Sequence, residues 1–222
     1  MDIIEAIQSR KSIRGYKSDP VPEEVLKEIL EVATRAPSSI NTQPWRIDVI
    51  AGEVMENIKK GNIEAINSGK PPNPDVPFDT YEGIYKKRQI GLVVELFRLM
   101  EITREDKEKR TAWTKRGYRI FDAPAAIILS VDKSLNAVRA FSDLGGLAQT
   151  ICMTSLHYGL GTCINGQGIL YPDVVRKFAD IPDTRLIFLC IAIGYPNWDF
   201  PANQINTERE SLDNNTSWHG FE

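Results

Sequence analysis

The stretch Arg10-Lys11-Ser12-Ile13-Arg14 is the one around which the rest of the chain is organised. Three cations and a hydroxyl stand within five residues, directly after an apolar segment, residues 2–9, whose spacing predicts a short helix. Arginine offers a planar fork of donors that matches phosphate oxygens, lysine adds a point charge, and serine donates one more hydrogen bond. A phosphorylated cofactor is therefore the first hypothesis. The alternative is a solvated basic turn, because cations are favoured at the C-terminal end of a helix.

The composition is typical of a globular protein, and it makes this basic stretch a local feature. A chain of 222 residues can bury a sizeable core, and we expect residues 1–222 to form a single domain. The net charge of −3 does not indicate a nucleic-acid binder. Neither a signal or transit peptide nor an apolar run of membrane-spanning length is visible, so we expect a cytoplasmic protein without a membrane partner.

The cysteines and histidines argue against disulfide and metal chemistry. Cys152, Cys163 and Cys190 are odd in number and widely spaced, and two of them lie inside apolar runs. This pattern predicts buried, reduced thiols. His157 and His219 are the only histidines in the sequence and there is no Cys-x-x-Cys pair, so a zinc site has almost no ligands to draw on. We expect no metal site.

A polar segment follows the second predicted helix. That helix begins after Pro22, has acidic residues in its first turn, and is ended by Pro37. The segment itself reads Pro37-Ser38-Ser39-Ile40-Asn41-Thr42-Gln43-Pro44-Trp45. Two interpretations stay open: a functional loop set between rigid elements, or a turn in which Ser and Asn side chains bond their own backbone.

Apolar periodicity predicts most of the remaining elements. Helices are expected over residues 53–68, 81–100 and 134–158, and strands over 47–51, 126–131 and 186–194. Four prolines within residues 70–77 predict an irregular loop, and the charge run 104–110 predicts a solvated helix face. The polar tail carries Arg209 and ends on aromatic residues, so we expect it to dock on another surface.

The helix over 134–158 carries small residues at helical spacing. They are Gly145, Ala148, Cys152 and Ser155, at steps of three, four and three. Such a stripe predicts close packing against another helix or a flat ligand. The alternative is an ordinary buried helix in the middle of the domain, because both interpretations follow from the same periodicity.

A glycine-rich run, residues 159–168, comes next. It resembles a dinucleotide-binding fingerprint, but the pattern requires glycine where Ile164 stands, and no clear strand precedes it. A Rossmann dehydrogenase is therefore disfavoured. Four glycines in ten residues still predict backbone that approaches another group closely or takes positive φ.

Four separated stretches, taken together, resemble the flavin-dependent nitroreductase family. They are residues 10–14, 36–45, 159–163 and 191–196. The resemblance covers nearly the whole chain. It implies an α+β fold with a central, mostly antiparallel sheet flanked by helices, and an intertwined homodimer with one FMN in each of two sites at the subunit interface.

The resemblance also implies roles for individual residues. The phosphate and ribityl chain of FMN are held by Arg10, Lys11, Ser12, Arg14 and, from the tail, Arg209. The segment that the partner subunit lays against the isoalloxazine ring contains Pro37, Ser38, Ser39 and Asn41. The turn whose backbone N–H reaches flavin N5 contains Asn165 and Gly166. The substrate channel lies within residues 62–121, with Tyr81, Tyr85 and Arg88 as candidates.

The implied activity is that of an NAD(P)H-dependent oxidoreductase. NAD(P)H reduces FMN and leaves, and a nitroaromatic, quinone-like or other electron-poor acceptor takes the vacated place, which is a ping-pong hydride mechanism. The flavin carries the chemistry, so no catalytic side chain is required. Two alternatives remain: a specialised flavoenzyme of the same fold, for enone reduction, dehalogenation or flavin cleavage, and a non-catalytic flavin-binding storage or sensor protein.

Overall fold

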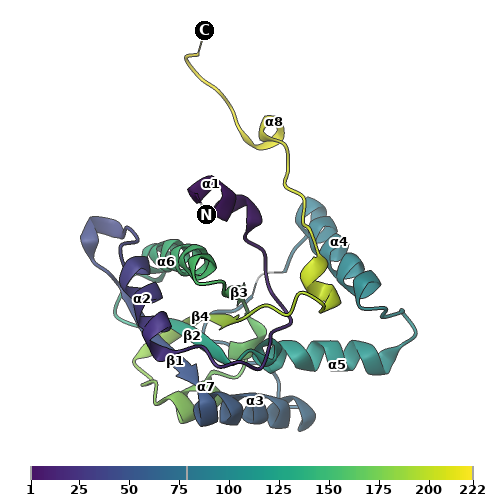
Figure 1. The fold of residues 1–222 in the computed structure, drawn as a ribbon. Coiled ribbons are helices and arrows are strands. Elements are labelled where there is room, and N and C mark those ends of the chain that lie inside the picture. The colour runs from purple at the N-terminus through teal and green to yellow at the C-terminus, as the bar shows by residue number, and fades with distance from the viewer. Residues whose placement is uncertain (1, 79, 222) are drawn as a thin grey trace.

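The computed structural model describes residues 2–78 and 80–221, and it is built around one four-stranded sheet (Figure 1). The strands are β1 (Trp45–Ala51), β2 (Ala125–Asp132), β3 (Gly161–Ile164) and β4 (Arg185–Gly194). Their order is β1-β2-β4-β3, and all three pairings are antiparallel. The predicted α+β fold with a mostly antiparallel sheet is confirmed.

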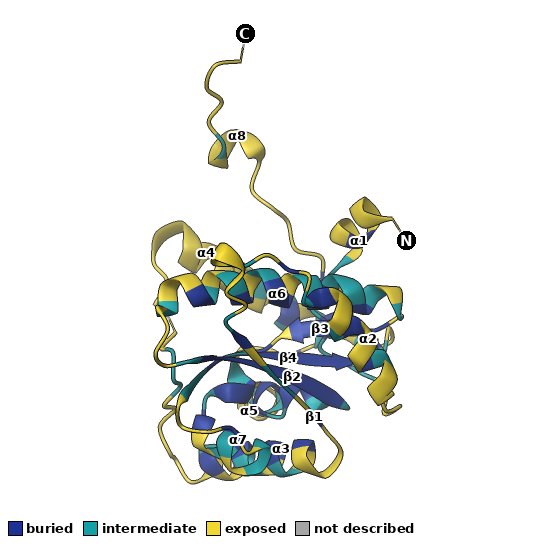
Figure 2. Ribbon diagram, turned by 90° about the vertical axis from the view of Figure 1, so that its left-hand side faces the viewer, coloured by how far each residue is buried: buried dark blue, intermediate teal, exposed yellow. Residues whose placement is uncertain are grey.

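The two central strands are continuous apolar runs because helices cover both faces of the sheet (Figure 2). On one face lie α1 (Ile3–Ser9), α2 (Glu23–Ala33) and α6 (Ala137–His157). On the other lie α3 (Gly52–Asn67), α5 (Lys107–Tyr118) and α7 (Pro172–Ala179). Within β2, neighbouring Ile127 and Ile128 point to opposite faces and both are fully buried.

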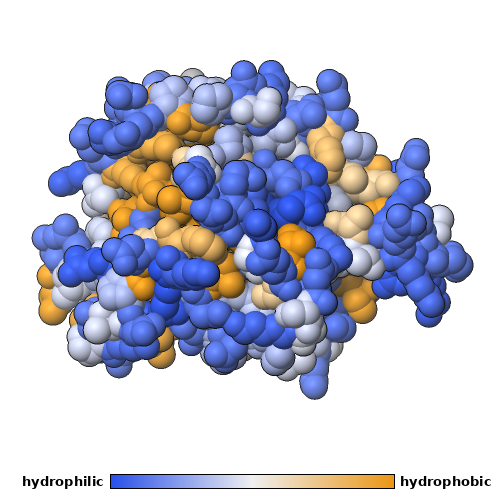
Figure 3. Space-filling model, turned by 90° about the horizontal axis from the view of Figure 1, so that it is seen from below, coloured by the Kyte–Doolittle hydropathy of each residue, from blue (hydrophilic) through white to orange (hydrophobic). Residues whose placement is uncertain are grey.

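Each face of the sheet has its own hydrophobic core. Ile29 of α2 and Leu147 of α6 pack on the side of Ile127, and Met55 and Ile58 of α3 pack on the side of Ile128. Figure 3, viewed from the side of α3 and α7, shows a largely hydrophilic outer surface broken by apolar patches. No helix within residues 2–78 and 80–221 has the length and apolar character needed to cross a lipid bilayer.

The small residues of α6 pack inside this chain. Ala148, Cys152 and Ser155 are all buried, and only Gly145 of the predicted stripe is exposed. The predicted close packing against another helix is therefore met within the chain, because these small residues let α6 lie close to α2 and to its own sheet.

The last segment leaves the body of the molecule. Helix α4 (Gly83–Leu99) runs beside residues 205–210, after which the chain extends outward through α8 (Leu212–Asn215) (Figure 1). Trp218 and Phe221 contact each other edge to face and are otherwise exposed. The docking predicted for this tail is therefore seen for residues 205–210, which lie against α4, and not for the described residues that follow.

Candidate functional site

The basic turn, residues 10–14, is fixed to the edge strand β3. The backbone N–H of Ile13 donates to the Thr162 carbonyl at 2.9 Å, and Ser12 forms a parallel bridge with Thr162. Ile13 is buried, so the apolar member of the turn anchors it while the polar members stay at the surface. Strand β3 was not predicted, because four residues in a glycine-rich run carry too little pattern to indicate a strand.

Three of the four stretches that carry the family resemblance meet at Gly161. A Cβ on Gly161 would lie 2.5 Å from Ile13 Cγ1 and 2.8 Å from Pro196 Cγ, which are closer than real side-chain contacts. An antiparallel bridge between Tyr16 and Pro196 holds the same corner. The predicted close approach of backbone is therefore confirmed, but the approaching groups belong to this chain. Gly159 takes the positive φ that was also predicted, at +69°.

A buried asparagine outside all four stretches clamps the basic turn. Asn203 Oδ1 accepts from the backbone N–H groups of Arg14 at 2.6 Å and Gly15 at 3.1 Å. Its Nδ2 donates to the carbonyls of Gly15 at 2.7 Å and Asn197 at 2.8 Å. The role of Asn203 was not predicted, because a single asparagine in a Pro-Ala-Asn turn gives no indication of partners far away in the chain.

Two cations of the basic turn, Lys11 and Arg14, bond to backbone carbonyls and not to carboxylates in the part of the chain that the structure describes. Among the described residues, Arg10, Lys11 and Arg14 form no ion pair with a carboxylate. Lys11 Nζ donates to the Asn203 carbonyl at 3.3 Å, and Arg14 Nη1 donates to the Ser12 carbonyl at 3.2 Å. Within residues 2–78 and 80–221, three partly buried cations therefore have no compensating carboxylate, which is the arrangement that an anion such as a phosphate requires.

The groups beneath the basic turn are held neutral. Burial raises the pKa of the Tyr16 phenol well above its ordinary value, and its O–H donates to the Ile13 carbonyl at 2.8 Å. Burial also raises the pKa of the Cys163 thiol, although the nearby Arg14 acts in the opposite direction. All three cysteines are buried free thiols, as predicted. Cys163 is therefore a packed thiol and not an activated nucleophile.

The turn at Asn165 and Gly166 follows β3 directly. Asn165 is buried, and its side chain bonds inward: Nδ2 donates to the Gly117 carbonyl at 3.0 Å, and Oδ1 accepts from the Gly168 N–H at 2.6 Å. Its backbone N–H donates to the Cys190 carbonyl at 2.7 Å. The hydrogen bonds of the Asn165 side chain are therefore all made within the protein. Gly166 is half-buried, and the Phe78 side chain lies against it.

A second cluster of charged side chains, which we call the charged turn, contacts the basic turn. It consists of Arg116, Arg119 and Asp122. Arg119 Nε donates to Asp122 Oδ1 at 2.6 Å, and Arg116 Nη1 donates to Asp122 Oδ2 at 2.8 Å. The backbone of residues 120–122 is left-handed at three consecutive non-glycine positions, with φ of 55°, 55° and 56°. Arg116 Nε also donates to the Arg14 carbonyl at 3.3 Å, so the two clusters touch.

The polar segment after Pro37 lies elsewhere on the chain. The backbone N–H of Ser39 donates to Asp143 Oδ2 of α6 at 3.2 Å, and the Ser38 hydroxyl accepts from the Gln43 N–H at 2.9 Å. Ile40 takes φ of +43° and is 95% exposed, which is unusual for a β-branched residue. Among the described residues, no hydrogen bond joins this segment to the basic turn.

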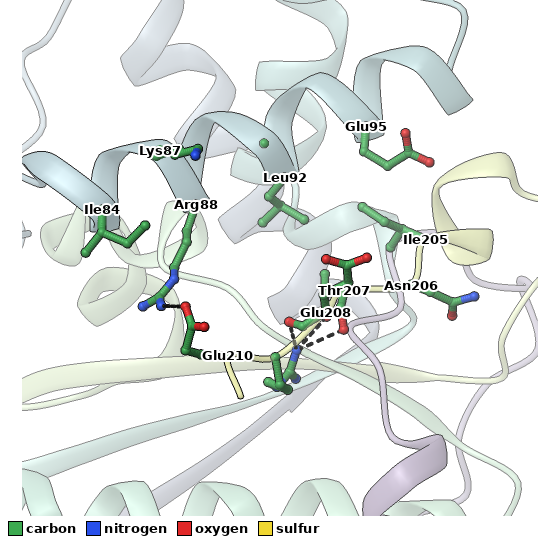
Figure 4. A pocket seen from close by; sticks show the side chains of 12 residues that line it. Ile84, Lys87, Arg88, Leu92, Glu95, Ile205, Asn206, Thr207, Glu208 and Glu210 are labelled. Carbon is green, nitrogen blue, oxygen red and sulfur yellow. Dashed lines mark hydrogen bonds and ion pairs between the residues drawn. The ribbon is translucent and has the colours of Figure 1, made fainter. Parts of the chain in front are cut away.

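Arg209 lies in a cleft of about 660 Å³ between α4 and residues 205–210 (Figure 4). Arg209 Nη1 donates to the Thr207 hydroxyl at 2.8 Å and to two backbone carbonyls. Arg88, one of the three channel candidates, lines the same cleft and pairs with Glu210 at 2.6 Å. Tyr81 and Tyr85 are exposed and are not among the lining residues. No interaction in the described chain joins Arg209 to Arg10.

Comparison with known proteins identifies a family. A profile described as Nitroreductase family matches residues 7–195. The chain is 32% identical over 220 residues to a nitrobenzene nitroreductase of Ectopseudomonas oleovorans, covering 97% of this chain and 96% of the relative. It is 58% identical over 215 residues to an NADH dehydrogenase of Thermus thermophilus, covering 96% of each. The crystal structure of an FMN- and NADPH-dependent nitroreductase, NfnB from Sphigopyxis sp. strain HMH, superposes over the full length of both chains with a TM-score of 0.95 at 28% identity.

Proposed function

The chain belongs to the nitroreductase family, and from that premise we propose that it is an FMN-dependent NAD(P)H oxidoreductase that reduces nitroaromatic or other electron-poor acceptors. The observation that carries the proposal is the basic turn, residues 10–14, whose cations form no ion pair within the described residues and which is fixed to Thr162 of β3, the strand that ends two residues before Gly166. A phosphorylated flavin needs cations for its phosphate and a backbone donor for its ring, and the basic turn and the turn after β3 supply one each.

The donor set at this corner fits FMN. Arg10, Lys11, Ser12 and Arg14 supply charge and a hydroxyl for the phosphate and ribityl chain, and Arg209 from the tail is proposed to complete the set. Asn165 and Gly166 supply the turn that faces the flavin ring, with the backbone N–H of Gly166 as the donor. When bound, FMN would carry reducing equivalents from NAD(P)H to the acceptor.

The protein groups bind and orient in this proposal, and none acts as an acid or base. Asn203 fixes the backbone of Arg14 and Gly15, so the cations are positioned before a ligand arrives. Tyr16 stays protonated because burial raises its pKa, and its hydroxyl donates within the chain. The residues beneath the basic turn therefore keep one charge state across the ordinary pH range.

We further propose a homodimer in which residues 1–222 form one domain and the partner contributes to each site. The segment Pro37, Ser38, Ser39 and Asn41 would lie against the flavin of the partner subunit. Its exposed, left-handed Ile40 and the outward tail are the features that support this arrangement. Sedimentation should give about twice the 25.0 kDa chain mass. A monodisperse monomer that retains FMN would contradict the proposal.

The activity is tested by an anaerobic titration of the purified protein, followed in the visible spectrum. We expect a yellow protein that is bleached by NADH or NADPH and recovers its colour when nitrobenzene is added. Donor and acceptor then use one site in turn, so double-reciprocal plots should be parallel. A bound flavin that neither nucleotide bleaches would indicate a storage or sensor protein instead.

The cytoplasm is the proposed location. The three free, buried thiols support it, because secreted proteins of this size commonly pair their cysteines.

A further inference from the structure

The proline-rich loop that precedes α4 is anchored to the body of the protein along its first half. The Lys70 carbonyl accepts from the Tyr171 hydroxyl at 2.9 Å, and the Asn73 N–H donates to the Leu170 carbonyl at 3.0 Å. Asp75 is largely buried and accepts from Arg176 Nη2 at 2.5 Å and from the Ile187 N–H at 2.7 Å. The loop is therefore fixed up to Asp75, only three residues before Phe78.

Phe78 is carried from that anchor onto the turn after β3. A Cβ on Gly166 would lie 2.5 Å from Phe78 Cζ and 2.6 Å from Cε1, so the ring rests directly on the Gly166 backbone. The ring is nevertheless 61% exposed. An aromatic side chain that only completes a core is normally buried, whereas this one presents most of its surface to solvent while touching the turn.

We propose that Phe78 is a specificity-determining residue that forms an apolar wall of the acceptor site. This inference rests on the proposed function, in which the Gly166 turn faces the flavin ring. An acceptor that approaches the flavin beside Gly166 meets the exposed ring of Phe78. A planar, electron-poor aromatic acceptor gains contact area and a favourable ring–ring interaction there, and an acceptor without an aromatic ring gains neither.

The direct test measures equilibrium binding without turnover. Nitrobenzene is titrated into the oxidised, FMN-loaded protein in the absence of NAD(P)H, and the flavin absorbance reports binding. Phe78→Ala should raise the Kd for nitrobenzene about tenfold, the upper end expected for loss of one aromatic pair. The Kd for FMN and the rate of ferricyanide reduction should change less than about twofold, within the contribution of weak contacts. Trp198→Ala, which removes another exposed aromatic ring, is the matched control and should leave the nitrobenzene Kd unchanged.

A double-mutant cycle tests the contact itself. Gly166→Ala keeps the backbone N–H but places a methyl group where the Phe78 ring lies, so it should displace the ring and weaken nitrobenzene binding. In the Phe78→Ala background the same substitution meets no ring, and its effect on the nitrobenzene Kd should largely vanish. Strictly additive effects of the two substitutions would overturn the contact.

Binding measurements distinguish failure of the Phe78 assignment from failure of the proposed function. If the wild-type protein binds FMN and Phe78→Ala binds nitrobenzene as tightly as wild type does, Phe78 is no part of the acceptor site and the proposed function stands. If Phe78→Ala loses FMN and nitrobenzene in parallel, the ring supports the flavin and the assignment to the acceptor is wrong. If the wild-type protein binds no FMN at all, the proposed function and this inference are both contradicted.

Discussion

The basic turn, residues 10–14, and the charged turn of Arg116, Arg119 and Asp122 contain similar side chains and have opposite electrostatic outcomes. In the charged turn, Asp122 accepts three hydrogen bonds from two arginines at 2.6 to 3.1 Å. In the basic turn, no carboxylate within the described residues pairs with any of the three cations. Arginines that are paired with a carboxylate stabilise the protein, whereas the cations of the basic turn remain available to an anionic ligand.

The ion pairs of the charged turn stabilise an unusual backbone conformation at residues 120–122. Three consecutive left-handed residues cost roughly 1–2 kcal/mol each, so this backbone needs external support. Arg116 provides it on both sides, because it binds Asp122 and donates to the Arg14 carbonyl. The Arg14 guanidinium in turn lies 5.9 Å from the centre of the Phe121 ring. The charged turn therefore supports the basic turn through these contacts.

We expect the largest loss of stability when Asn203, which holds the backbone of the basic turn, is replaced. Asn203→Ala removes four hydrogen bonds and leaves buried backbone groups of Arg14 and Gly15 without partners. At roughly 1–3 kcal/mol for each unsatisfied buried group, the free energy of unfolding should fall by about 3 kcal/mol or more, measured by urea denaturation. Asn67→Ala, an exposed asparagine at the end of α3, is the control and should change it by less than about 0.5 kcal/mol.

Removing the Asp122 carboxylate from the charged turn should destabilise the protein without changing its preference for FMN over riboflavin. Asp122→Asn removes the carboxylate between Arg116 and Arg119, and a hydrogen bond to a charged group is worth about 1.5–3 kcal/mol. We expect the free energy of unfolding to fall by about 2 kcal/mol. The ratio of riboflavin to FMN dissociation constants should stay within about twofold of wild type. If the ratio collapses instead, the charged turn takes part in binding and the distinction between the two clusters is lost.

Substitution of Arg209 tests whether the tail and the basic turn bind the same phosphate. It lies almost two hundred residues from Arg10, in the cleft beside α4, and is proposed to meet the same phosphate. Arg209→Ala should weaken FMN binding by about one to two powers of ten, at about 1.4 kcal/mol per tenfold, and should scarcely change riboflavin binding. Fluorescence titration with both flavins measures this. Equal losses for FMN and riboflavin would reduce Arg209 to a general contributor to the fold of the tail.

The sequence predicted the layered fold well because its strands and helices carry strong apolar periodicity. The buried runs of β2 and β4 and the amphipathic pattern of α2 lie where they were expected. The short strand β3 was missed, since pairing with β4 and with the basic turn defines it more than its own four residues do. The small-residue stripe of α6 predicted close packing against a helix, but its periodicity did not show that this helix would be α2 of the same chain.

Of the candidate site, only the cations could be predicted from the sequence. The cations of residues 10–14 are visible in the sequence, and the meeting of this stretch with Gly161 and Pro196 agrees with the motifs that suggested it. Asn203 and Phe78 could not be predicted, because each acts through contacts with residues far away in the chain. Whether the segment from Pro37 to Asn41 reaches a flavin depends on a second subunit, and it stays a prediction.

If the basic turn binds the phosphate of FMN, its cations should distinguish FMN from riboflavin, which lacks the phosphate. Dissociation constants of FMN and riboflavin are compared for the wild-type apoprotein and for Arg10→Gln. We predict that wild type binds FMN at least about a hundredfold more tightly than riboflavin, since several charged hydrogen bonds of about 1.5–3 kcal/mol depend on the phosphate. Arg10→Gln should narrow that ratio about tenfold or more without weakening riboflavin. Equal affinity of the wild-type protein for the two flavins would contradict the account.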